Sequence, residues 1–267
     1  MELAGRRALL TGATGGLGMA IAKALVGRGA KVTLSSRRGD ALQALAEELA
    51  GEGHRALVGD LAQPGAAERL AAEAGEVDIL IANAGLPAAG LLSDFTSEQV
   101  SRALRVNLEA PMLMAQALVP AMLERGCGHM VFVSSLSGKA AAPRSSIYNA
   151  TKFGLRGFAL GLRADLAPRG VGVSLVSPGF IREAGMFAES GVKPPAGLGT
   201  ASPAQVGEAV VRAVEQDRVE LAVAPLPQRV LAHLALATPT ISARVQGGSA
   251  GQKKAKEIAD GHPDSKR

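Results

Sequence analysis

Short, almost uninterrupted runs of apolar residues recur along this chain, and each is followed by a longer Ala- and Leu-rich stretch with helical spacing. A strand that is apolar at nearly every position is buried on both faces, as in a parallel sheet covered by helices. The pattern predicts an α/β fold, a doubly wound domain of about seven parallel strands with helices on both faces. The runs lie at residues 8–12, 31–36, 55–60, 77–85, 129–135, 171–179 and 219–225.

Residues 1–225 carry this alternation and are expected to form one domain, since α/β domains of more than 200 residues are common. Two segments depart from this alternation of strands and helices. Residues 181–202 are dense in Gly and Pro after a predicted strand end, which is typical of a mobile flap over a substrate. Residues 226–267 offer a short amphipathic stretch around Leu231–Leu236 and then a basic end, so we expect a helical and then loosely ordered tail.

Composition narrows the class of protein. Hydrophobic residues make up 47% of the chain, which indicates a globular protein and not a disordered one. Cys127 is the sole cysteine, so no internal disulfide is expected, and the first residues lack the apolar run of a signal peptide. We therefore expect a cytoplasmic protein. No apolar run approaches the roughly 18 to 20 residues that cross a bilayer, so no transmembrane segment is expected.

The net charge of +5 does not by itself indicate a nucleic-acid-binding protein. Residues 240–267 hold six Lys and Arg against three Asp and Glu, so more than half of the excess lies in the tail. A clustered basic face with interleaved aromatic residues is missing, and we expect no nucleic acid as partner. The histidines, at 54, 129, 233 and 262, lack the spacing of metal ligands, so no metal site is expected.

The first predicted strand leads into TGATGGLG, a stretch with four glycines, of which Gly12, Gly16 and Gly18 have the spacing G-x-x-x-G-x-G. Glycines at the start of a helix let the backbone approach a pyrophosphate, whose charge the helix amides and dipole stabilise. The spacing G-x-x-x-G-x-G differs from the dinucleotide pattern G-x-G-x-x-G, and the G-K-[ST] ending of a P-loop is missing. The stretch predicts a nucleotide-binding turn, and the alternative is a glycine-rich turn that serves packing alone.

The residues after the second predicted strand bear on the choice of cofactor. An acidic residue about 20 positions beyond the glycines would bind the ribose 2′-hydroxyl of NAD, whereas an Arg accommodates the 2′-phosphate of NADP. Here Ser36, Arg37 and Arg38 occupy that place, and no acidic residue precedes Asp40. The pattern predicts a preference for NADP(H) over NAD(H). The alternative is that both arginines are solvated loop residues.

The only tyrosine of the chain stands four residues before a lysine, in SSIYNATKFG. On a helix, Tyr148 and Lys152 share one face. A phenol has a reference pKa of about 10, and a nearby cation favours the phenolate and lowers that value. The predicted strand VFVSS ends upstream at Ser134 and Ser135, where a hydroxyl could donate to a carbonyl oxygen that gains charge as hydride arrives. Together these residues predict a carbonyl/alcohol redox site.

Several short motifs occur together along the chain. They are T-G-x-x-x-G-x-G at 11–18, N-A-G at 83–85, the Asn of RVN at 107, the serine before Y-x-x-x-K, and P-G at 178–179. With these motifs, the chain resembles the short-chain dehydrogenase/reductase family. The match runs from about residue 5 to residue 224, and the combination of motifs is specific even though each one alone is weak. The resemblance implies an NAD(P)-binding catalytic domain of the Rossmann type over residues 1–225.

The resemblance also implies roles for individual residues. Tyr148 would be the general acid–base, and Ser135, which lies at the family's usual thirteen-residue distance from it, would orient the substrate. Lys152 would hold the nicotinamide ribose and tune Tyr148, while Asn107 would position a water that extends the proton path. The implied cofactor-binding residues are Thr11, Gly12, Thr14, Gly16, Leu17, Gly18, Ser36, Arg37, Asp60, Leu61, Asn83, Ala84, Gly85, Tyr148, Lys152, Pro178, Gly179 and Ile181.

One position departs from the family pattern. Many relatives have a threonine five positions beyond the proline of P-G, where it bonds the cofactor, and here that place is Glu183. A carboxylate beside a phosphate would repel it, so we expect Glu183 to point elsewhere. The backbone of Ile181 could still bind the carboxamide.

The leading hypothesis is an NADP(H)-dependent oxidoreductase that interconverts a ketone or aldehyde and an alcohol by hydride transfer. Two alternatives stay open: an NAD-dependent alcohol dehydrogenase, and a cofactor-binding or sensing protein without catalysis on the same fold. By resemblance we expect a homodimer or homotetramer. Few charges are found among the expected pocket residues, which favours a neutral, apolar small-molecule substrate; these residues are Leu86, Pro87, Leu136, Ala141, Ala142, Met186 and Phe187.

Overall fold

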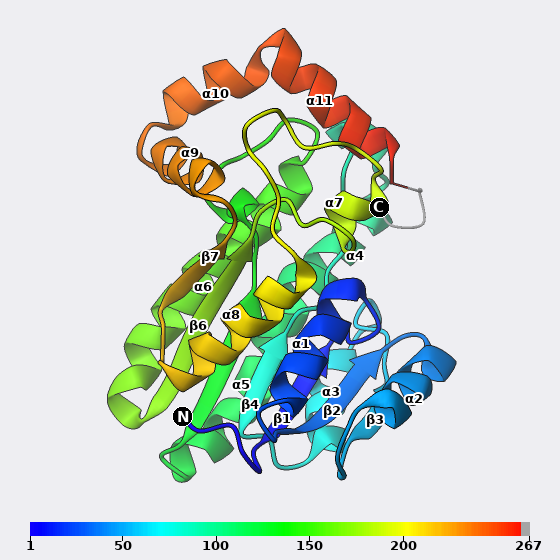
Figure 1. Ribbon diagram of the computed structural model, residues 1–267, viewed down its shortest axis with the longest axis vertical. Helices are drawn as coiled ribbons and strands as arrows, with labels where there is room; N and C mark the ends of the chain where they lie inside the picture. The colour runs from blue at the N-terminus through cyan, green and yellow to red at the C-terminus, as the bar shows by residue number, and fades with distance from the viewer. Residues whose placement is uncertain (263–267) are drawn as a thin grey trace.

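The structure, a computed structural model, describes residues 1–262, with only the backbone at residue 250. Its centre is a sheet of seven parallel strands in the order β3-β2-β1-β4-β5-β6-β7 (Figure 1). This confirms the predicted doubly wound α/β sheet, and each strand begins and ends within three residues of its predicted run. The strands are β1 (Arg7–Thr11), β2 (Lys31–Ser36), β3 (Arg55–Val58), β4 (Ile79–Ala82), β5 (Gly128–Val133), β6 (Val171–Pro178) and β7 (Glu220–Val223).

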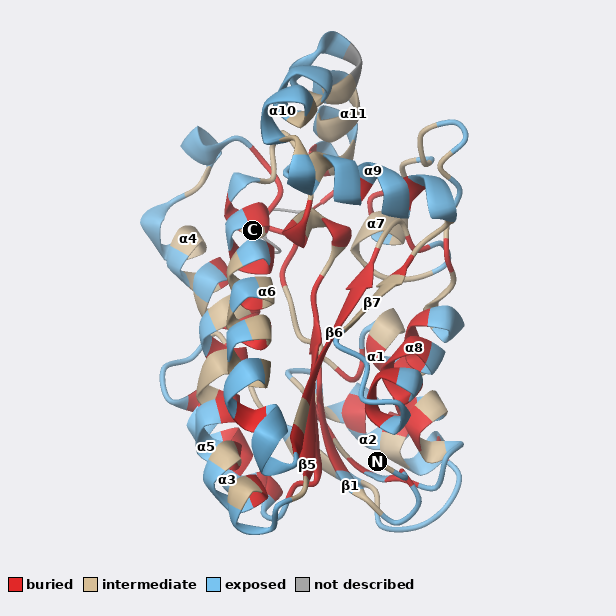
Figure 2. Cartoon of the chain, turned by 90° about the vertical axis from the view of Figure 1, so that its left-hand side faces the viewer, coloured by how far each residue is buried: buried red, intermediate tan, exposed pale blue. Residues whose placement is uncertain are grey.

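Helices cover both faces of the sheet, which explains why the strands are apolar at successive positions (Figure 2). Leu9 and Leu10 are both fully buried although they point to opposite faces of β1. Leu10 packs toward α1, α2 and α8, and Leu9 toward α3, α5 and α6. The bounds of these helices are α1 (Gly16–Val26), α2 (Gly39–Glu48), α3 (Ala66–Ala74), α5 (Ala110–Glu124), α6 (Ser146–Leu166) and α8 (Pro203–Glu215).

One uninterrupted helical stretch, Ser97–Glu124, contains α4 (Ser97–Leu104), a π-helical turn η2 (Arg105–Glu109) and α5. By length and composition alone, it is the one helix in the described part of the chain that could cross a bilayer, although no such segment was expected. Core helices of globular proteins meet the same criteria. Met114 of α5 is fully buried against the sheet, so the packing places this helix in the core.

The segment 181–202 has little regular structure, as a flap would. Its only helix is the four-residue α7 (Met186–Glu189), and a bridge between Ile181 and Ala201 closes its base. The rings of Phe180 and Phe187 pack with centroids 4.5 Å apart. We refer to residues 181–202 as the flap.

The C-terminal residues begin with a helix, as expected, but differ from the loosely ordered end expected after it. They form three helices, α9 (Leu226–Ala237), α10 (Pro239–Gly247) and α11 (Ser249–Asp260), which bridge the carboxyl end of the sheet as an arch (Figure 1, orange to red). The polar composition of α11 suggested a solvated chain, but Lys254–Glu257 and Lys256–Asp260 ion pairs join its successive turns. Residues 263–267 of the expected tail lie outside the described residues.

Helix α8 packs onto α1 through a glycine. A Cβ atom added at Gly207 would lie 2.6 Å from the carbonyl oxygen of Ala20 and 3.0 Å from the Cβ of Ala24. The backbones of the two helices therefore approach more closely than any larger residue allows. By contrast, Gly161 lies on the exposed side of α6 with open space around it.

We predict opposite effects of Gly207→Ala and Gly161→Ala on the free energy of unfolding. The first should lower it by about 1 to 3 kcal/mol, because the added methyl group overpacks the interface between α1 and α8. The second should raise it by about 0.5 to 1 kcal/mol, because alanine costs less backbone entropy than glycine in a helix. Urea denaturation of both variants measures this, and effects of the same sign would contradict the described packing.

Candidate active site

A cavity of about 1580 Å³ lies at the carboxyl ends of the strands. It extends from the glycine-rich loop, past Tyr148 and Lys152, to the flap and the arch. This is the edge of a doubly wound sheet at which ligands bind. Because the predicted cofactor-binding residues line one continuous space with Ser135, Tyr148 and Lys152, they can act on one pair of ligands.

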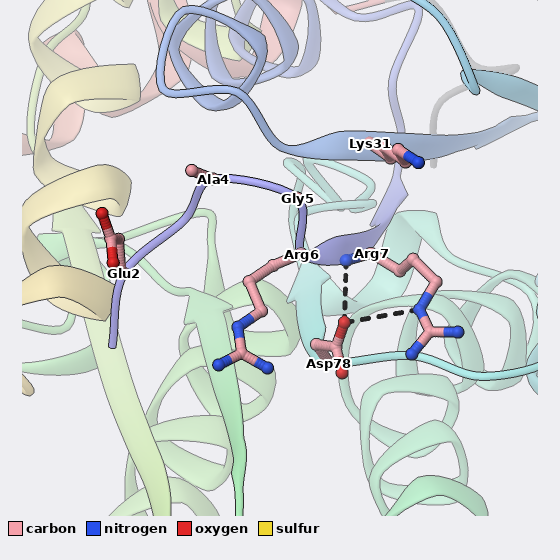
Figure 3. A pocket seen from close by; sticks show the side chains of 7 residues that line it. All are labelled: Glu2, Ala4, Gly5, Arg6, Arg7, Lys31 and Asp78. Atoms are coloured by element: carbon pink, nitrogen blue, oxygen red, sulfur yellow. Dashed lines mark hydrogen bonds and ion pairs between the residues drawn. The ribbon is translucent and has the colours of Figure 1, made fainter.

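A second hollow, of about 410 Å³, lies at the other end of the sheet, beside the start of β1 (Figure 3). Of its two carboxylates, Glu2 and Asp78, the latter already accepts hydrogen bonds from the backbone amide of Arg7 at 2.9 Å and from its Nε at 3.4 Å. None of the predicted site residues lines it. The candidate active site is therefore the larger cavity.

The glycine-rich loop is fastened to the end of β4 by Thr11 and Asn83. The hydroxyl oxygen of Thr11 accepts the backbone amides of Asn83 and Ala84, both at 3.1 Å. In return, Asn83 Nδ2 donates to the carbonyl oxygens of Thr11 at 3.0 Å and Gly12 at 3.3 Å. These bonds fix the loop relative to the N-A-G segment, which lines the same cavity.

The geometry of this loop fits a pyrophosphate. Gly12 has a φ of +65°, and a Cβ there would lie 2.9 Å from the Cα of Ala84. Helix α1 has Gly15 as its N-cap, which has no side chain to accept from the first-turn amides. Gly16 and Leu17 of that turn line the cavity, so the positive end of the α1 dipole faces the ligand space.

The two arginines after β2 have different surroundings. Arg38 is tied to the loop, because its Nη2 donates to the carbonyl oxygen of Thr14 at 2.5 Å and its Nε to the hydroxyl of Thr14 at 3.3 Å. Arg37 lines the cavity, is exposed, and has no hydrogen bond or ion pair with any described residue. Its guanidinium is free to bind an anion. Ser36 and Asp60, with Leu61, line the same end.

Tyr148 and Lys152 lie one turn apart on α6, with Lys152 Nζ 5.6 Å from the centroid of the tyrosine ring. Burial raises the pKa of Tyr148 to about 12, and its hydrogen bond with the Ser135 side chain acts in the opposite direction. Burial lowers the pKa of Lys152 to about 8. Each shift disfavours the charged form, as the removal of water from a charge does.

Lys152 has capacity left for a ligand. Its side chain is 3% exposed, and Nζ donates to the carbonyl oxygen of Val133 at 3.0 Å. No carboxylate of the described residues pairs with it. An ammonium group has three N–H donors, so two remain for groups that enter the cavity.

The two serines at the end of β5 have different surroundings. Ser134 is buried and its hydroxyl donates to the carbonyl oxygen of Lys152 at 3.4 Å. Ser135 faces Tyr148, and its hydroxyl oxygen accepts the backbone amide of Ser137 at 3.1 Å. Ser135, the residue at the predicted distance from the tyrosine, is therefore the one brought to the site.

Asn107 is fully buried in the π-helical turn η2 and is not among the described residues that line the cavity. Its Oδ1 accepts the amide of Leu86 at 2.6 Å, and its Nδ2 donates to the Leu86 carbonyl at 2.9 Å and to Thr151 Oγ1 at 3.3 Å. The side chain therefore braces the segment after N-A-G against α6. Its role in holding a water stays a prediction.

The end of β6 lies opposite the glycine-rich loop. Pro178, Gly179 and Ile181 line the cavity, as the predicted cofactor contacts require. Glu183 lies outside that lining; its carboxylate pairs with the neighbouring Arg182 at 2.8 Å and is 65% exposed. The flap thus keeps this carboxylate away from the phosphate end, as the charge argument anticipates.

Sequence reasoning missed Gln228 of α9, which joins the arch to the flap. This side chain is 5% exposed; Oε1 accepts the amide of Phe180 at 3.0 Å, and Nε2 donates to the carbonyls of Leu198 at 3.2 Å and Gly199 at 2.8 Å. Every polar atom of the amide is thus used. The available signal was a polar residue at the start of an apolar stretch, which does not indicate its partners.

Thr151, which bonds Asn107, was also missed. It sits between Tyr148 and Lys152 in sequence, and its hydroxyl donates to the carbonyl oxygen of Tyr148 at 2.8 Å. A threonine inside a helix carries no signal of its own, since such residues often bond back to the preceding turn.

Comparisons with known proteins agree with this geometry. The sequence model of the family described as short chain dehydrogenase matches residues 6–194. Ketoacyl reductase HetN of Nostoc sp. is 34% identical over 247 residues, 90% of this chain and 86% of that protein. Human dehydrogenase/reductase SDR family member 4 is 39% identical over 188 residues, 67% of each chain. A short-chain dehydrogenase from Sphingobium yanoikuyae, solved with NADPH, has a TM-score of 0.76 and 27% identity, and the match covers 91% of this chain and 94% of that one.

The family match spans most of the chain and includes the glycine-rich loop, N-A-G and the Ser–Tyr–Lys residues. Three features of the cavity fit the nicotinamide cofactor that members of this family bind. They are the sharp turn at Gly12, the uncapped first turn of α1 and the two free N–H donors of Lys152. The chain belongs to the short-chain dehydrogenase/reductase family and is an oxidoreductase that acts on CH–OH groups with a nicotinamide cofactor.

Proposed function

We propose that the protein is an NADP(H)-dependent oxidoreductase that interconverts a ketone or aldehyde and an alcohol, with Tyr148 as general acid–base. The observation that carries this proposal is the convergence of Ser135, Tyr148 and Lys152 in the cavity whose other end holds the unpaired Arg37. A protein that only binds or senses a cofactor has no need of a serine bonded to a tyrosine in the cavity wall. The intact trio therefore favours catalysis over that alternative.

The side chains supply the proton and the electrostatic support. When bound, the nicotinamide supplies or accepts the hydride. As the carbonyl oxygen gains negative charge, Ser135 donates a hydrogen bond to it and Tyr148 transfers its phenolic proton to it. The reaction leaves an alcohol and a tyrosinate, and the ammonium of Lys152 stabilises this tyrosinate.

Two features favour reduction as the direction at neutral pH. Burial raises the pKa of Tyr148 to about 12, so the phenol holds the proton that reduction needs. Oxidation of an alcohol needs the phenolate, which burial disfavours. The similarity to a protein named as a ketoacyl reductase supports the same direction.

The preference for NADP(H) rests on Arg37. Its unpaired guanidinium suits the dianionic 2′-phosphate, and no acidic side chain stands between Ser36 and Asp40 to bind a 2′-hydroxyl. The similar structure solved with NADPH supports this choice. The glycine-rich loop would hold the pyrophosphate, Asp60 with Leu61 the adenine, and Lys152 the nicotinamide ribose.

Replacement of Tyr148 by phenylalanine should lower kcat for carbonyl reduction by about 100- to 10,000-fold, the usual contribution of general acid–base catalysis. The ring and its packing remain, so the Kd for NADPH should stay unchanged. Turnover followed at the NADPH absorbance over a panel of aldehydes and ketones, with fluorescence titration of NADPH, measures both. A variant that keeps its turnover would refute the role of Tyr148.

Arg37→Ala should lower kcat/KM for NADPH by about 10- to 100-fold, because a hydrogen bond to a charged group contributes about 1.5 to 3 kcal/mol. The value for NADH should not change, since NADH has no 2′-phosphate. Arg169→Ala is the matched control, because Arg169 is an exposed arginine next to the start of β6, at the opposite edge of the sheet. Higher kcat/KM of the unmodified protein with NADH than with NADPH would overturn the proposed preference.

The pH dependence of kcat/KM for NADPH should report Lys152. Below its pKa of about 8 the lysine is an ammonium that can bind ribose and stabilise the tyrosinate, and above that pH it becomes neutral. Tyr148 stays protonated over this range because its pKa is about 12. We therefore expect a constant kcat/KM from pH 6 to near 8 and a tenfold fall per pH unit above it. A flat profile to pH 10 would contradict the role of Lys152.

A further inference from the structure

We propose that the hollow beneath the arch binds a long apolar chain on the substrate, so that the enzyme acts on long-chain carbonyl compounds. The placement of the substrate carbonyl at Ser135 and Tyr148 rests on the proposed function. The binding of the apolar chain is independent of that function, since it depends only on α9, α10, α11 and the flap.

The cavity is larger than one ligand needs. Its volume of about 1580 Å³ exceeds the about 300 to 1,000 Å³ of a usual ligand pocket. The same space reaches from Gly12 and Arg37, at the cofactor end, to Ile258 and His262 at the far end of the arch. A cofactor at the glycine-rich loop therefore leaves the part beneath the arch for a second ligand.

Each helix of the arch turns one face to this hollow. The lining positions recur at intervals of three or four residues, which marks one side of a helix. The residues of the outer side, among them Val230 and Lys253, do not line it. The lining positions are Gln228, Leu231, Ala232, Leu234, Ala235 and Thr238 at α9, Ile241, Ser242, Val245 and Gln246 in α10, and Gly251, Lys254, Ala255 and Ile258 in α11.

The inner face is mostly apolar, and none of the described residues covers its large aliphatic side chains. Leu231, Leu234, Ile241 and Val245 are 53%, 55%, 60% and 71% exposed, although all four line the cavity. Water in the hollow therefore contacts large aliphatic side chains. The charged residue among them, Lys254, is paired with a carboxylate of its own helix. A neutral hydrocarbon chain would displace this water without leaving a charge unpaired.

The arch is held at both ends, so the hollow is formed before a ligand enters. At the α9 end, Gln228 donates two hydrogen bonds to the flap and accepts a third from Phe180, the residue just before it. At the α11 end, His262 is buried, with Nε2 2.9 Å from the carbonyl oxygen of Met186 and Nδ1 2.8 Å from that of Ile258. Figure 1 shows the end of α11 beside α7. A preformed site binds its ligand at a lower entropic cost.

The flap connects the arch to the catalytic residues. Met186, which accepts the bond from His262 through its carbonyl oxygen, extends its side chain toward Gly85, where a Cβ would lie 3.4 Å from Met186 Cε. Gly85 lies near Lys152 Nζ, at 3.9 Å from that same Cβ position. The apolar hollow thus continues up to the catalytic residues, and a chain bound in it leads to Tyr148.

A chain-length series tests the inference on the full protein with NADPH. With unbranched aldehydes of four to fourteen carbons, kcat/KM should rise about fourfold per CH2, the equivalent of 0.8 kcal/mol for a buried methylene, until the hollow is filled. Leu234→Gln should lower kcat/KM at least about tenfold for the twelve-carbon aldehyde and leave the four-carbon one unchanged. Leu234 is exposed, so the variant keeps its fold.

Val230→Gln is the matched control, because Val230 is 46% exposed on the outer side of the same helix, and it should not change the series. A kcat/KM independent of chain length would overturn the inference. A second result would also overturn it: Leu234→Gln changes the oligomeric state measured by sedimentation but leaves the chain-length series unaltered. The apolar face would then form a contact between copies of the chain.

Calorimetric binding of 1-decanol separates this inference from the proposed function. If no carbonyl is turned over but decanol binds and Leu234→Gln weakens its binding about tenfold, the proposed function fails and the hollow is still a chain-binding site. If short aldehydes are reduced but decanol does not bind, the proposed function stands and the inference fails.

Discussion

The hydrogen bonds between Thr11 and Asn83 hold the site together at the point where the order of the strands reverses. β1 and β4 are neighbours in the sheet, yet the chain leaves them toward opposite faces. One threonine oxygen accepts two amides of the β4 segment, and the asparagine returns two bonds to the loop after β1. The glycine-rich loop lies on one side of this junction, and the N-A-G segment lies on the other. Their relative position therefore depends on four hydrogen bonds that join residues about 70 positions apart.

The catalytic residues occupy a place where charge is costly. Burial raises the pKa of Tyr148 and lowers that of Lys152, so each residue tends toward its neutral form when no ligand is present. Lys152 is stabilised by one carbonyl of β5 and by no carboxylate among the described residues. A site of this kind gives up some stability of the fold, and a ligand that satisfies the spare donors recovers it. Ser135 then limits the shift at the tyrosine, since its hydrogen bond favours the phenolate.

Most of the sheet was predictable because burial on two faces leaves a pattern in consecutive residues, as at Leu9 and Leu10. The pairing of Tyr148 with Lys152 was predictable because helical spacing is local. The partners of Asn107 and Gln228 were not, since each bonds backbone groups at least twenty residues away, and no local pattern encodes such distances. The last two helices of the arch, α10 and α11, were missed for another reason: a helix as rich in charged residues as α11 has the composition of a solvated chain.

The π-helical turn between α4 and α5 lets one continuous helical stretch pack its two halves in different directions. Each residue of an α-helix advances the side chain by about 100°, and a π turn contains one residue more than an α turn. The apolar stripe of α4, with Ala103 packed near Ile147, is therefore out of phase with that of α5, which buries Met114 against the sheet. Ala103 and Met114 are eleven residues apart in sequence, so an unbroken α-helix over the same residues would turn both toward nearly the same side. One of the two stripes would then leave its partner, so this helical stretch keeps both contacts only because the π turn takes up one extra residue between them.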